Sequence, residues 1–368
     1  MANRSLTLDR RTLAPDLARG VMLLVIALAH THLFTVLIGG PDRSGSTADR
    51  LATAGTVMLV DLRGYPMFAA LFGYGLAQIH RRLGDPWPRA RGMIRRRGLW
   101  LIAFGLAHVV LLFPADILTV YGLTAVLLAG ALRLRDRTLI VWAALWLPVT
   151  TAVHALVAAD DAMTGDGLPR LSDGLGFRLS LFSAIAVMML ISTVVPFLAG
   201  ILASRHRLLG KPRPLRAIAA VGIPLSVLGG LPLALDKAGV WTGVTPADVM
   251  LATALHQATG YAGGLGYAAL IALLALRLDH RRGPVVDALA ALGERSLTFY
   301  LAQSLAWALL FSSYALHLRL TSPAVAVLVA LAVWLATVLL ADLMRRRDIR
   351  GPAETALRHL TYAHARDR

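Results

Sequence analysis

Arg19 and His30 are the residues of the first hydrophobic segment, LARGVMLLVIALAHTHLF, that could do chemistry together. At about 100° per residue, a spacing of eleven comes to about three helical turns, so both side chains share one face about 16 Å apart. Ionisable groups inside lipid are costly and usually face a protein interior. The pair therefore predicts a site that holds an anion near one membrane surface and moves protons near the middle.

A second histidine, His108, lies eight residues before Asp116, which belongs to the tight-turn stretch FPADILTVYG (113–122) together with Tyr121. The turn can bring the imidazole towards the carboxylate. A carboxylate orients an imidazole and raises its basicity, the arrangement of a general base. A polar cap on a turn is the alternative interpretation.

Asp61 and Arg63 are predicted at a depth similar to that of His30, in the second hydrophobic segment. Two residues apart, they point to different faces of a helix, so at least one should meet another helix. They fit either a site beside His30 or a structural ion pair between helices.

Tyr300, Gln303 and Ser304 have the i, i+3, i+4 spacing that places side chains on one helix face. Such a stripe can bind a hydroxyl or carbonyl group, or hold two helices together by hydrogen bonds. The single histidines His154 and His256 are interpreted as helix-packing groups.

Metal chemistry has little support in the sequence. The chain has no cysteine, and the closely spaced histidines of the HTH tripeptide (residues 30–32) diverge on a helix. We therefore expect no metal and no tightly bound cofactor.

These residues must be positioned by a membrane-embedded bundle. Hydrophobic residues make up 57% of the chain and charged residues 16%. Apolar stretches long enough to span a membrane recur throughout, which predicts an all-α polytopic bundle of about ten spans. The ten stretches are 20–38, 54–79, 98–114, 117–134, 138–158, 179–203, 217–235, 249–276, 292–313 and 323–343.

The distribution of basic residues predicts the topology. With both termini cytoplasmic, 28 of the 37 Lys and Arg lie on the inner side and six on the outer side. We expect one integral membrane domain over 1–368, with a short inner segment 1–18 and a basic inner tail 344–368. The net charge of +16 then reflects this bias and attraction to anionic lipid, and we expect no nucleic-acid partner. Composition favours a bacterial cytoplasmic (inner) membrane.

Longer sequence patterns resemble a known family. The LxRG start, FxxLFGYGLAQIHRR (68–82), the stretch from RRRGLWLIAFGLAH to LRDRTL (95–139), GERSLTFYLAQS and RGPAETALRHLTY are similar to DUF418 (YeiB-like) membrane proteins. That family is similar to the wider transmembrane acyltransferases, which include the acyltransferase-3 proteins and the lysosomal heparan glucosaminide N-acetyltransferase. Arg19 and His30 fit the R-X10-H motif of acyltransferase-3 proteins. DUF418-like chains often carry Asn at the position of His30, which favours His108 and Asp116.

The resemblance implies acyl transfer from a cytosolic acyl-CoA, such as acetyl-CoA, to a small-molecule, glycan or lipid acceptor. His30 or His108 would be the base, oriented by Asp116 or Asp61. Arg19 would hold donor phosphates, and Arg63, Tyr300 or Gln303 would stabilise the oxyanion. A proton-coupled transporter of a small amphiphile fits the same intramembrane charges. A membrane enzyme acting on another lipidic substrate, such as an isoprenoid, is a weaker alternative. The sequence leaves open whether the chain forms a homodimer.

Overall fold

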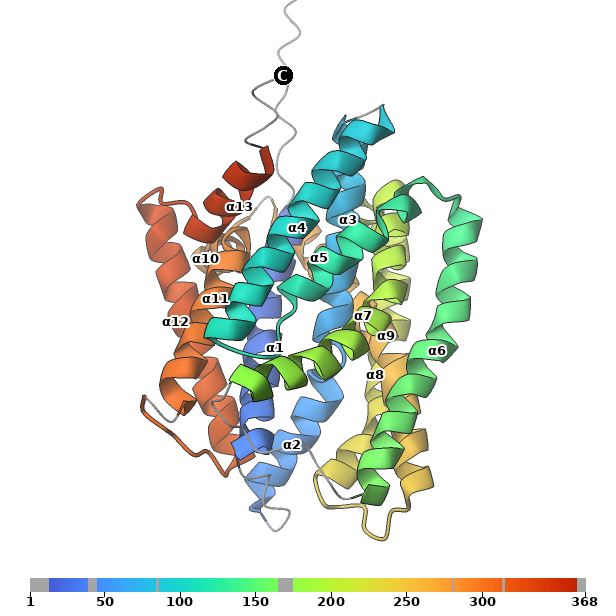
Figure 1. The fold of residues 1–368 in the computed structure, drawn as a ribbon, viewed down its shortest axis with the longest axis vertical. Helices are drawn as coiled ribbons and strands as arrows, with labels where there is room; N and C mark the ends of the chain where they lie inside the picture. Colours follow the sequence, from blue (N-terminus) through green and yellow to red (C-terminus); the bar gives the residue numbers. More distant parts are fainter. Residues whose placement is uncertain are drawn as a thin grey trace, which may run out of the picture.

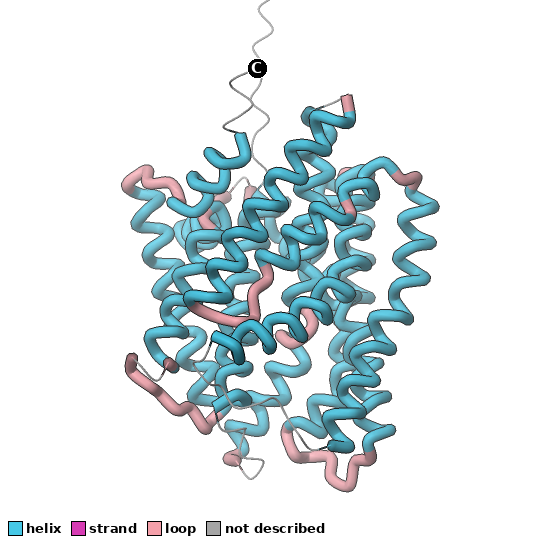
Figure 2. The backbone as a smooth tube through the Cα atoms, in the orientation of Figure 1, coloured by secondary structure: helices cyan, strands magenta, loops and turns pink. Residues whose placement is uncertain are grey.

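The computed structural model describes residues 13–38, 45–83, 86–164, 175–279, 281–312 and 315–362, which form a bundle of helices. These residues include no strand, as Figure 2 shows. The helices are α1 (Leu13–Ile38), α2 (Thr47–Leu59), α3 (Gly64–Leu83), α4 (Trp87–Leu111), α5 (Leu118–Leu127), η1 (Ala129–Arg133), α6 (Asp136–Thr164), α7 (Leu175–Arg205), η2 (Leu208–Gly210), α8 (Pro212–Lys237), α9 (Pro246–Leu278), α10 (Pro284–Glu294), α11 (Ser296–Phe311), α12 (Pro323–Arg346) and α13 (Pro352–Tyr362).

Local signals in the sequence account for several helix starts. Ser46 and Asp49 form a capping box at the start of α2, and Thr245 and Asp248 form another at the start of α9. Proline occupies the first turn of α4, α8, α9, α10 and α12, where its missing N–H costs no hydrogen bond.

The apolar stretches predicted as spans are largely helical; 117–134 continues from α5 into the short helix η1, and two other stretches are each divided into two α-helices. The stretch 54–79 breaks into α2 and α3, and Leu62 in the break has a positive φ of 57°. The stretch 292–313 breaks into α10 and α11 at Arg295. Such breaks are tolerated at membrane depth where neighbouring helices bury the freed backbone.

Six of the described helices are long and apolar enough to cross a membrane: α1, α6, α7, α8, α9 and α12. Apolar helices α5 and α11 are shorter. The predicted all-helical architecture is thus confirmed, and these six helices have the length and composition of the spans of a multi-pass membrane protein, while ten crossings and the orientation of the termini stay predictions.

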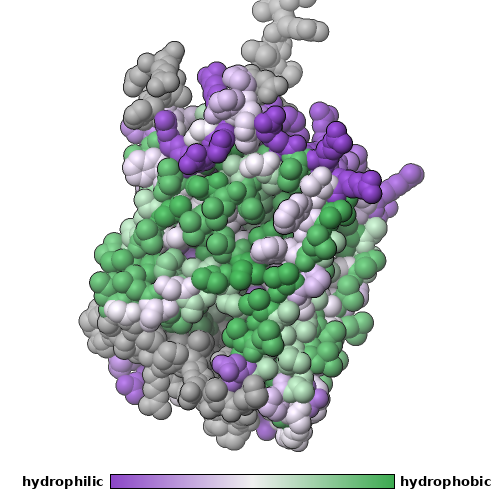
Figure 3. Space-filling view, turned by 45° about the vertical axis from the view of Figure 1, so that its right-hand side comes forward, coloured by the Kyte–Doolittle hydropathy of each residue, from purple (hydrophilic) through white to green (hydrophobic). Residues whose placement is uncertain are grey.

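Charged side chains gather at one end of the bundle. On the face drawn in Figure 3, hydrophilic side chains (purple) cluster at the upper end of the bundle, above a broad hydrophobic band. We call this the basic end; it carries Arg81 at the end of α3, Arg205 at the end of α7 and Arg345 at the end of α12. The charge pattern of the sequence predicted such an accumulation on one side.

Helices α4 and α5 form a hairpin that enters the bundle from the basic end. In Figure 1 their connecting turn lies well within the height of the bundle rather than at its opposite end. The sequence predicted an outer turn here; α5, with only ten residues, is too short to cross the bundle. The hairpin therefore carries its polar turn into the protein interior.

Candidate functional site

The tip of the α4–α5 hairpin brings His108 and Asp116 together. Nδ1 of His108 lies 3.0 Å from Oδ1 of Asp116, and both side chains are completely inaccessible. The other carboxylate oxygen accepts a hydrogen bond from the backbone N–H of Thr119, at 2.6 Å, in the first turn of α5. The carboxylate is thus fixed by the backbone while it faces the imidazole.

A glycine permits this close approach. A Cβ atom on Gly105, one turn before His108 in α4, would lie 2.3 Å from Oδ2 of Asp116 and 2.2 Å from Oγ1 of Thr119. No other residue type fits without displacing the carboxylate.

Helix α11 contributes Tyr300 to the same cluster. Its hydroxyl lies 3.5 Å from Oδ1 of Asp116 and accepts a hydrogen bond from the backbone N–H of Ile117, at 3.4 Å. Its ring centroid is 5.1 Å from that of His108. Tyr300 therefore joins α11 to the hairpin tip.

Helix α1 contributes His30. Its ring lies 4.7 Å from that of Phe113, in the hairpin turn, and 6.2 Å from that of Tyr300. Nδ1 of His30 and Nε2 of His108 are buried, and neither has a hydrogen-bond partner among the described residues. The structure thus gathers His30, His108, Asp116 and Tyr300 from three parts of the chain.

Of the other two predicted site residues on α11, Ser304 has a hydrogen-bond partner among the described residues and Gln303 has none. Ser304 donates its hydroxyl to the carbonyl of Tyr300, which is a contact within the helix. Gln303 is fully buried, and neither atom of its amide has a partner among the described residues. Nε1 of the buried Trp307, one turn further along the same face, is likewise unpartnered. Native proteins rarely leave such groups unsatisfied, so this face has spare capacity for a polar ligand or water.

Tyr121 serves the core. Its ring stacks on Phe72, with centroids 5.2 Å apart, and its hydroxyl donates to the carbonyl of Tyr65 at 3.3 Å. These contacts bind α5 to α3.

Arg63 lies in a different polar cluster from His30. Its guanidinium donates to the carbonyl of Asp61 (2.6 Å), to the carbonyl of Ser226 (2.7 Å) and to the hydroxyl of Ser226 (2.9 Å). Nη1 also lies 2.8 Å from Nδ1 of His256. Arg63 is fully buried, and it forms no ion pair with a carboxylate in the described parts of the chain. Its contacts are with α8, α9 and the α2–α3 break rather than with the hairpin tip.

A further network continues from this region, and the sequence interpretation missed most of it. The amide nitrogen of Gln257 donates to the hydroxyls of Tyr65 (2.7 Å) and Tyr261 (2.9 Å). Tyr261 also lies within hydrogen-bond distance of Thr150 and donates to the carbonyl of Ser192. The i, i+4 spacing of Gln257 and Tyr261 was the available signal, but the helices that they face are distant in sequence.

Arg19 lies towards the basic end and pairs with Asp16 in the preceding turn of α1. Its side chain is 33% exposed. The described contacts link it to Asp16, not to the hairpin cluster, so Arg19 and His30 occupy different parts of α1.

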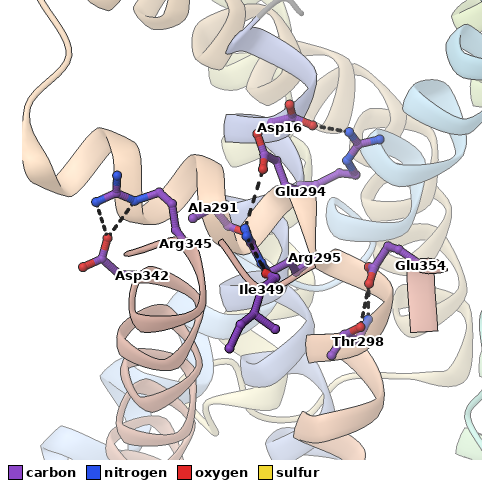
Figure 4. A network of polar contacts seen from close by, with 10 residues as sticks. Asp16, Ala291, Glu294, Arg295, Thr298, Asp342, Arg345, Ile349 and Glu354 are labelled. Atoms are coloured by element: carbon purple, nitrogen blue, oxygen red, sulfur yellow. Dashed lines mark hydrogen bonds and ion pairs between the residues drawn. The ribbon is translucent and has the colours of Figure 1, made fainter. Parts of the chain in front are cut away.

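The two C-terminal stretches of the family resemblance meet near this end, as Figure 4 shows. Arg295 of the GERS sequence donates from Nε (3.0 Å) and Nη2 (2.9 Å) to the carbonyl of Ile349. The carboxylate of Glu354, in α13, accepts hydrogen bonds from the backbone N–H groups of Leu297 and Thr298 at the start of α11. The network fixes the helix that carries Tyr300 and Gln303.

Metal binding gains no geometric support. No group of three or more His, Cys, Asp or Glu side chains in the described ranges is arranged to hold a metal ion.

Comparison with known protein families finds a match in the C-terminal part of the chain. Residues 203–364 match the family described as protein of unknown function (DUF418). The matched segment holds α11 with Tyr300 and Gln303, and the Arg295 and Glu354 contacts, but not the α4–α5 hairpin.

Two bacterial proteins are similar to nearly the whole chain. The chain is 24% identical to the uncharacterized protein YxaH of Bacillus subtilis, over 94% of this chain and 93% of that protein. It is 26% identical to the uncharacterized protein YeiB of Escherichia coli, over 96% of this chain and 97% of that protein. The family match supports the DUF418 resemblance of residues 203–364, and neither relative carries an activity in its name.

Proposed function

We propose that the protein is a transmembrane acyltransferase that moves an acyl group from a cytosolic acyl-CoA, such as acetyl-CoA, to a hydroxyl or amine acceptor. The observation that carries the proposal is the buried His108–Asp116 pair, with an unpartnered Nε2 on the imidazole. A histidine whose other nitrogen faces a carboxylate is the usual general base of acyl transfer.

In this proposal Asp116 holds the Nδ1 proton of His108, which leaves Nε2 to accept a proton from the acceptor. The acceptor oxygen or nitrogen then attacks the thioester carbonyl, and the carbon–sulfur bond breaks as the acyl bond forms. The leaving thiolate of CoA takes the proton back from Nε2, so protons and electrons balance. His30, beside Tyr300, is the second candidate base.

Stabilisation of the oxyanion falls to Gln303 in this scheme. Its amide N–H groups are buried and unpartnered, which is the state required of a donor that awaits a developing charge. Tyr300 supplies a hydroxyl within the same cluster. Arg63, the other residue considered for this role, is occupied by its contacts with Ser226 and His256.

We further propose that the basic end faces the cytosol and that the protein lies in a bacterial inner membrane. The excess of Lys and Arg at one end follows the positive-inside pattern, and both named relatives are bacterial. An acyl-CoA would then enter from the end that carries Arg19, and the acceptor would approach from the other side.

The test uses the absence of cysteine from the chain. Any free thiol that forms in a reaction with acetyl-CoA comes from CoA, so a chromogenic thiol reagent reports turnover without background from the protein. Purified wild type in lipid nanodiscs is compared with H108A and H30A, and with H359A as the control, because His359 is exposed on α13. Loss of thiol release in H108A or H30A supports the proposal; unchanged release in both contradicts the assignment of the base.

A proton-coupled transporter of a small amphiphile is the second candidate, and Arg63 favours it. A fully buried arginine beside His256 is the kind of intramembrane group that transporters use. Proteoliposomes with an imposed pH gradient distinguish the two functions. Accumulation of a labelled amphiphile without covalent product supports transport, and thiol release from acetyl-CoA supports acyl transfer.

A further inference from the structure

A cavity of about 370 Å³ opens at the basic end, away from the hairpin cluster. It is bounded by the ends of α3 and α7, by the turn after α7 and by η1. Its volume lies in the lower part of the range of small-ligand sites. The lining residues are Ala77, His80, Arg81, Leu132, Ser204, Arg205 and Arg207.

Three arginines line the cavity, and one of them, Arg205, is held in place by contacts with the neighbouring elements. Arg205 donates to the carbonyls of Leu132 (2.8 Å) and Leu134 (2.7 Å) and pairs with Asp136 at 2.6 Å. These contacts tie the end of α7 to η1 and to the start of α6. Arg205 is therefore a structural residue whose charge is already matched by a carboxylate.

The other two arginines are not neutralised in this way. No ion pair among the described residues involves Arg81 or Arg207. Arg81 donates one Nη1 hydrogen bond to the carbonyl of Ser204, at 3.1 Å, which joins its guanidinium to the end of α7 and leaves the other N–H groups available. Two arginines without a described counter-charge thus line the cavity.

Ser204 adds a buried donor. The residue is 1% exposed, and its hydroxyl has no hydrogen-bond partner among the described residues although it lines the cavity. A buried hydroxyl without a protein partner is unusual in a folded protein, and here it offers a donor to a ligand in the cavity. The unpartnered hydroxyl of Ser204 is an observation independent of the arginines. A bias of positive charge towards one side of the membrane would explain the arginines alone, but it would not explain this hydroxyl.

The backbone at Arg207 is the third observation. Arg207 has φ 49° and ψ 43°, a left-handed conformation that is unfavourable for a residue with a side chain. Such strain persists where the surroundings enforce it, and it is concentrated at ligand sites. Here it directs the chain around the mouth of the cavity directly after α7 ends.

We propose that this cavity binds the phosphoryl group of a phosphate ester. Guanidinium groups donate pairs of parallel N–H bonds that match phosphate oxygens, and a hydroxyl donor completes the set. The same chemistry suits an anionic phospholipid headgroup and a soluble phosphorylated molecule. The inference does not depend on acyl transfer, because binding, not turnover, defines the site.

The test measures binding of two probes to purified protein in phosphatidylcholine nanodiscs. Adenosine 3′,5′-bisphosphate, titrated by calorimetry, represents the soluble source. Phosphatidylglycerol, mixed into the nanodisc and counted by native mass spectrometry, represents the lipid source. The variants are R207Q and S204A, with R213Q as the control, because Arg213 is an exposed arginine just beyond the same turn with no described side-chain contact.

We expect at least one probe to bind wild type and R213Q equally and to bind R207Q about tenfold more weakly, since a charge-assisted hydrogen bond is lost. S204A, which keeps every charge, should weaken the same probe by a smaller factor. The probe that responds identifies the source. The proposal is overturned if neither probe binds wild type, or if R207Q and S204A bind both probes as R213Q does.

Discussion

His108 and Asp116 face each other across the turn between α4 and α5, with Nδ1 and Oδ1 3.0 Å apart and both side chains sealed from solvent. The pair is positioned by local structure: Asp116 accepts the N–H of Thr119 and so is fixed to the first turn of α5. A hairpin that returns inside the bundle places the pair where water is excluded, which strengthens any electrostatic interaction with a substrate.

Replacing Asp116 by asparagine should reduce acyl transfer with little loss of fold. The side chain keeps an oxygen for the Thr119 N–H but can no longer hold the Nδ1 proton of His108. We expect turnover to fall by about 100-fold to 10,000-fold, the range for loss of general-base catalysis. Thiol release from acetyl-CoA measures it, with thermal unfolding as a check on the fold. Full turnover in D116N would show that the pair is only a structural cap.

Gly105 should prove essential for the hairpin tip. In G105A the new methyl group would meet Oγ1 of Thr119 at 2.2 Å, so α4 and α5 must move apart. We expect a loss of about 1–3 kcal/mol in stability, as for other overpacked sites, and a loss of turnover.

The matched control for G105A is G92A in the same helix. A Cβ on Gly92 meets nothing within 4 Å, so alanine there should stabilise the helix slightly. Thermal unfolding of both variants gives the comparison. If G105A and G92A unfold at the same temperature, the close packing of α4 against α5 at Gly105 is contradicted.

The sequence predicted some contacts of the candidate site and not others. The approach of His108 to Asp116 followed from a short turn, and the common face of Tyr300 and Gln303 followed from helical spacing, because both relationships are local. The position of Arg63 did not follow, because an apolar stretch without a break signal within residues 60–63 divides into α2 and α3. The break turns Arg63 towards α8 and α9, and only tertiary packing decides that.

The sequence also could not predict that the α4–α5 turn lies inside the bundle. Hydropathy identifies an apolar stretch, but it does not distinguish a crossing helix from a short helix such as α5 that returns inside the protein. His256 illustrates the same limit: a single histidine in an apolar helix has no local signal for its partner Arg63, which lies 193 residues away.

Glu354 should control how α13 docks on the bundle. Its carboxylate accepts two backbone N–H groups at the start of α11 and the hydroxyl of Thr298 at 2.5 Å. In E354A the start of α11 loses this cap, and we expect about 1–2 kcal/mol less stability and faster proteolysis of the C-terminal segment. Limited proteolysis followed by mass spectrometry measures it. R358Q, an exposed change in the same helix, is the control and should be cleaved as wild type is.

Arg63 should be required for stability whichever function the protein has. In R63M the carbonyls of Asp61 and Ser226 lose their donors, and His256 loses its closest polar neighbour. We expect the free energy of unfolding to fall by about 3–5 kcal/mol, since buried polar groups are left without hydrogen-bond partners. R63K keeps the charge but not the forked geometry, and its stability should lie between those of R63M and wild type.

Thermal unfolding in detergent measures the stability of this series, with R216Q, an exposed change on α8, as the control. If R63M unfolds as R216Q does and yet abolishes uptake driven by a pH gradient, the arginine serves transport rather than the fold.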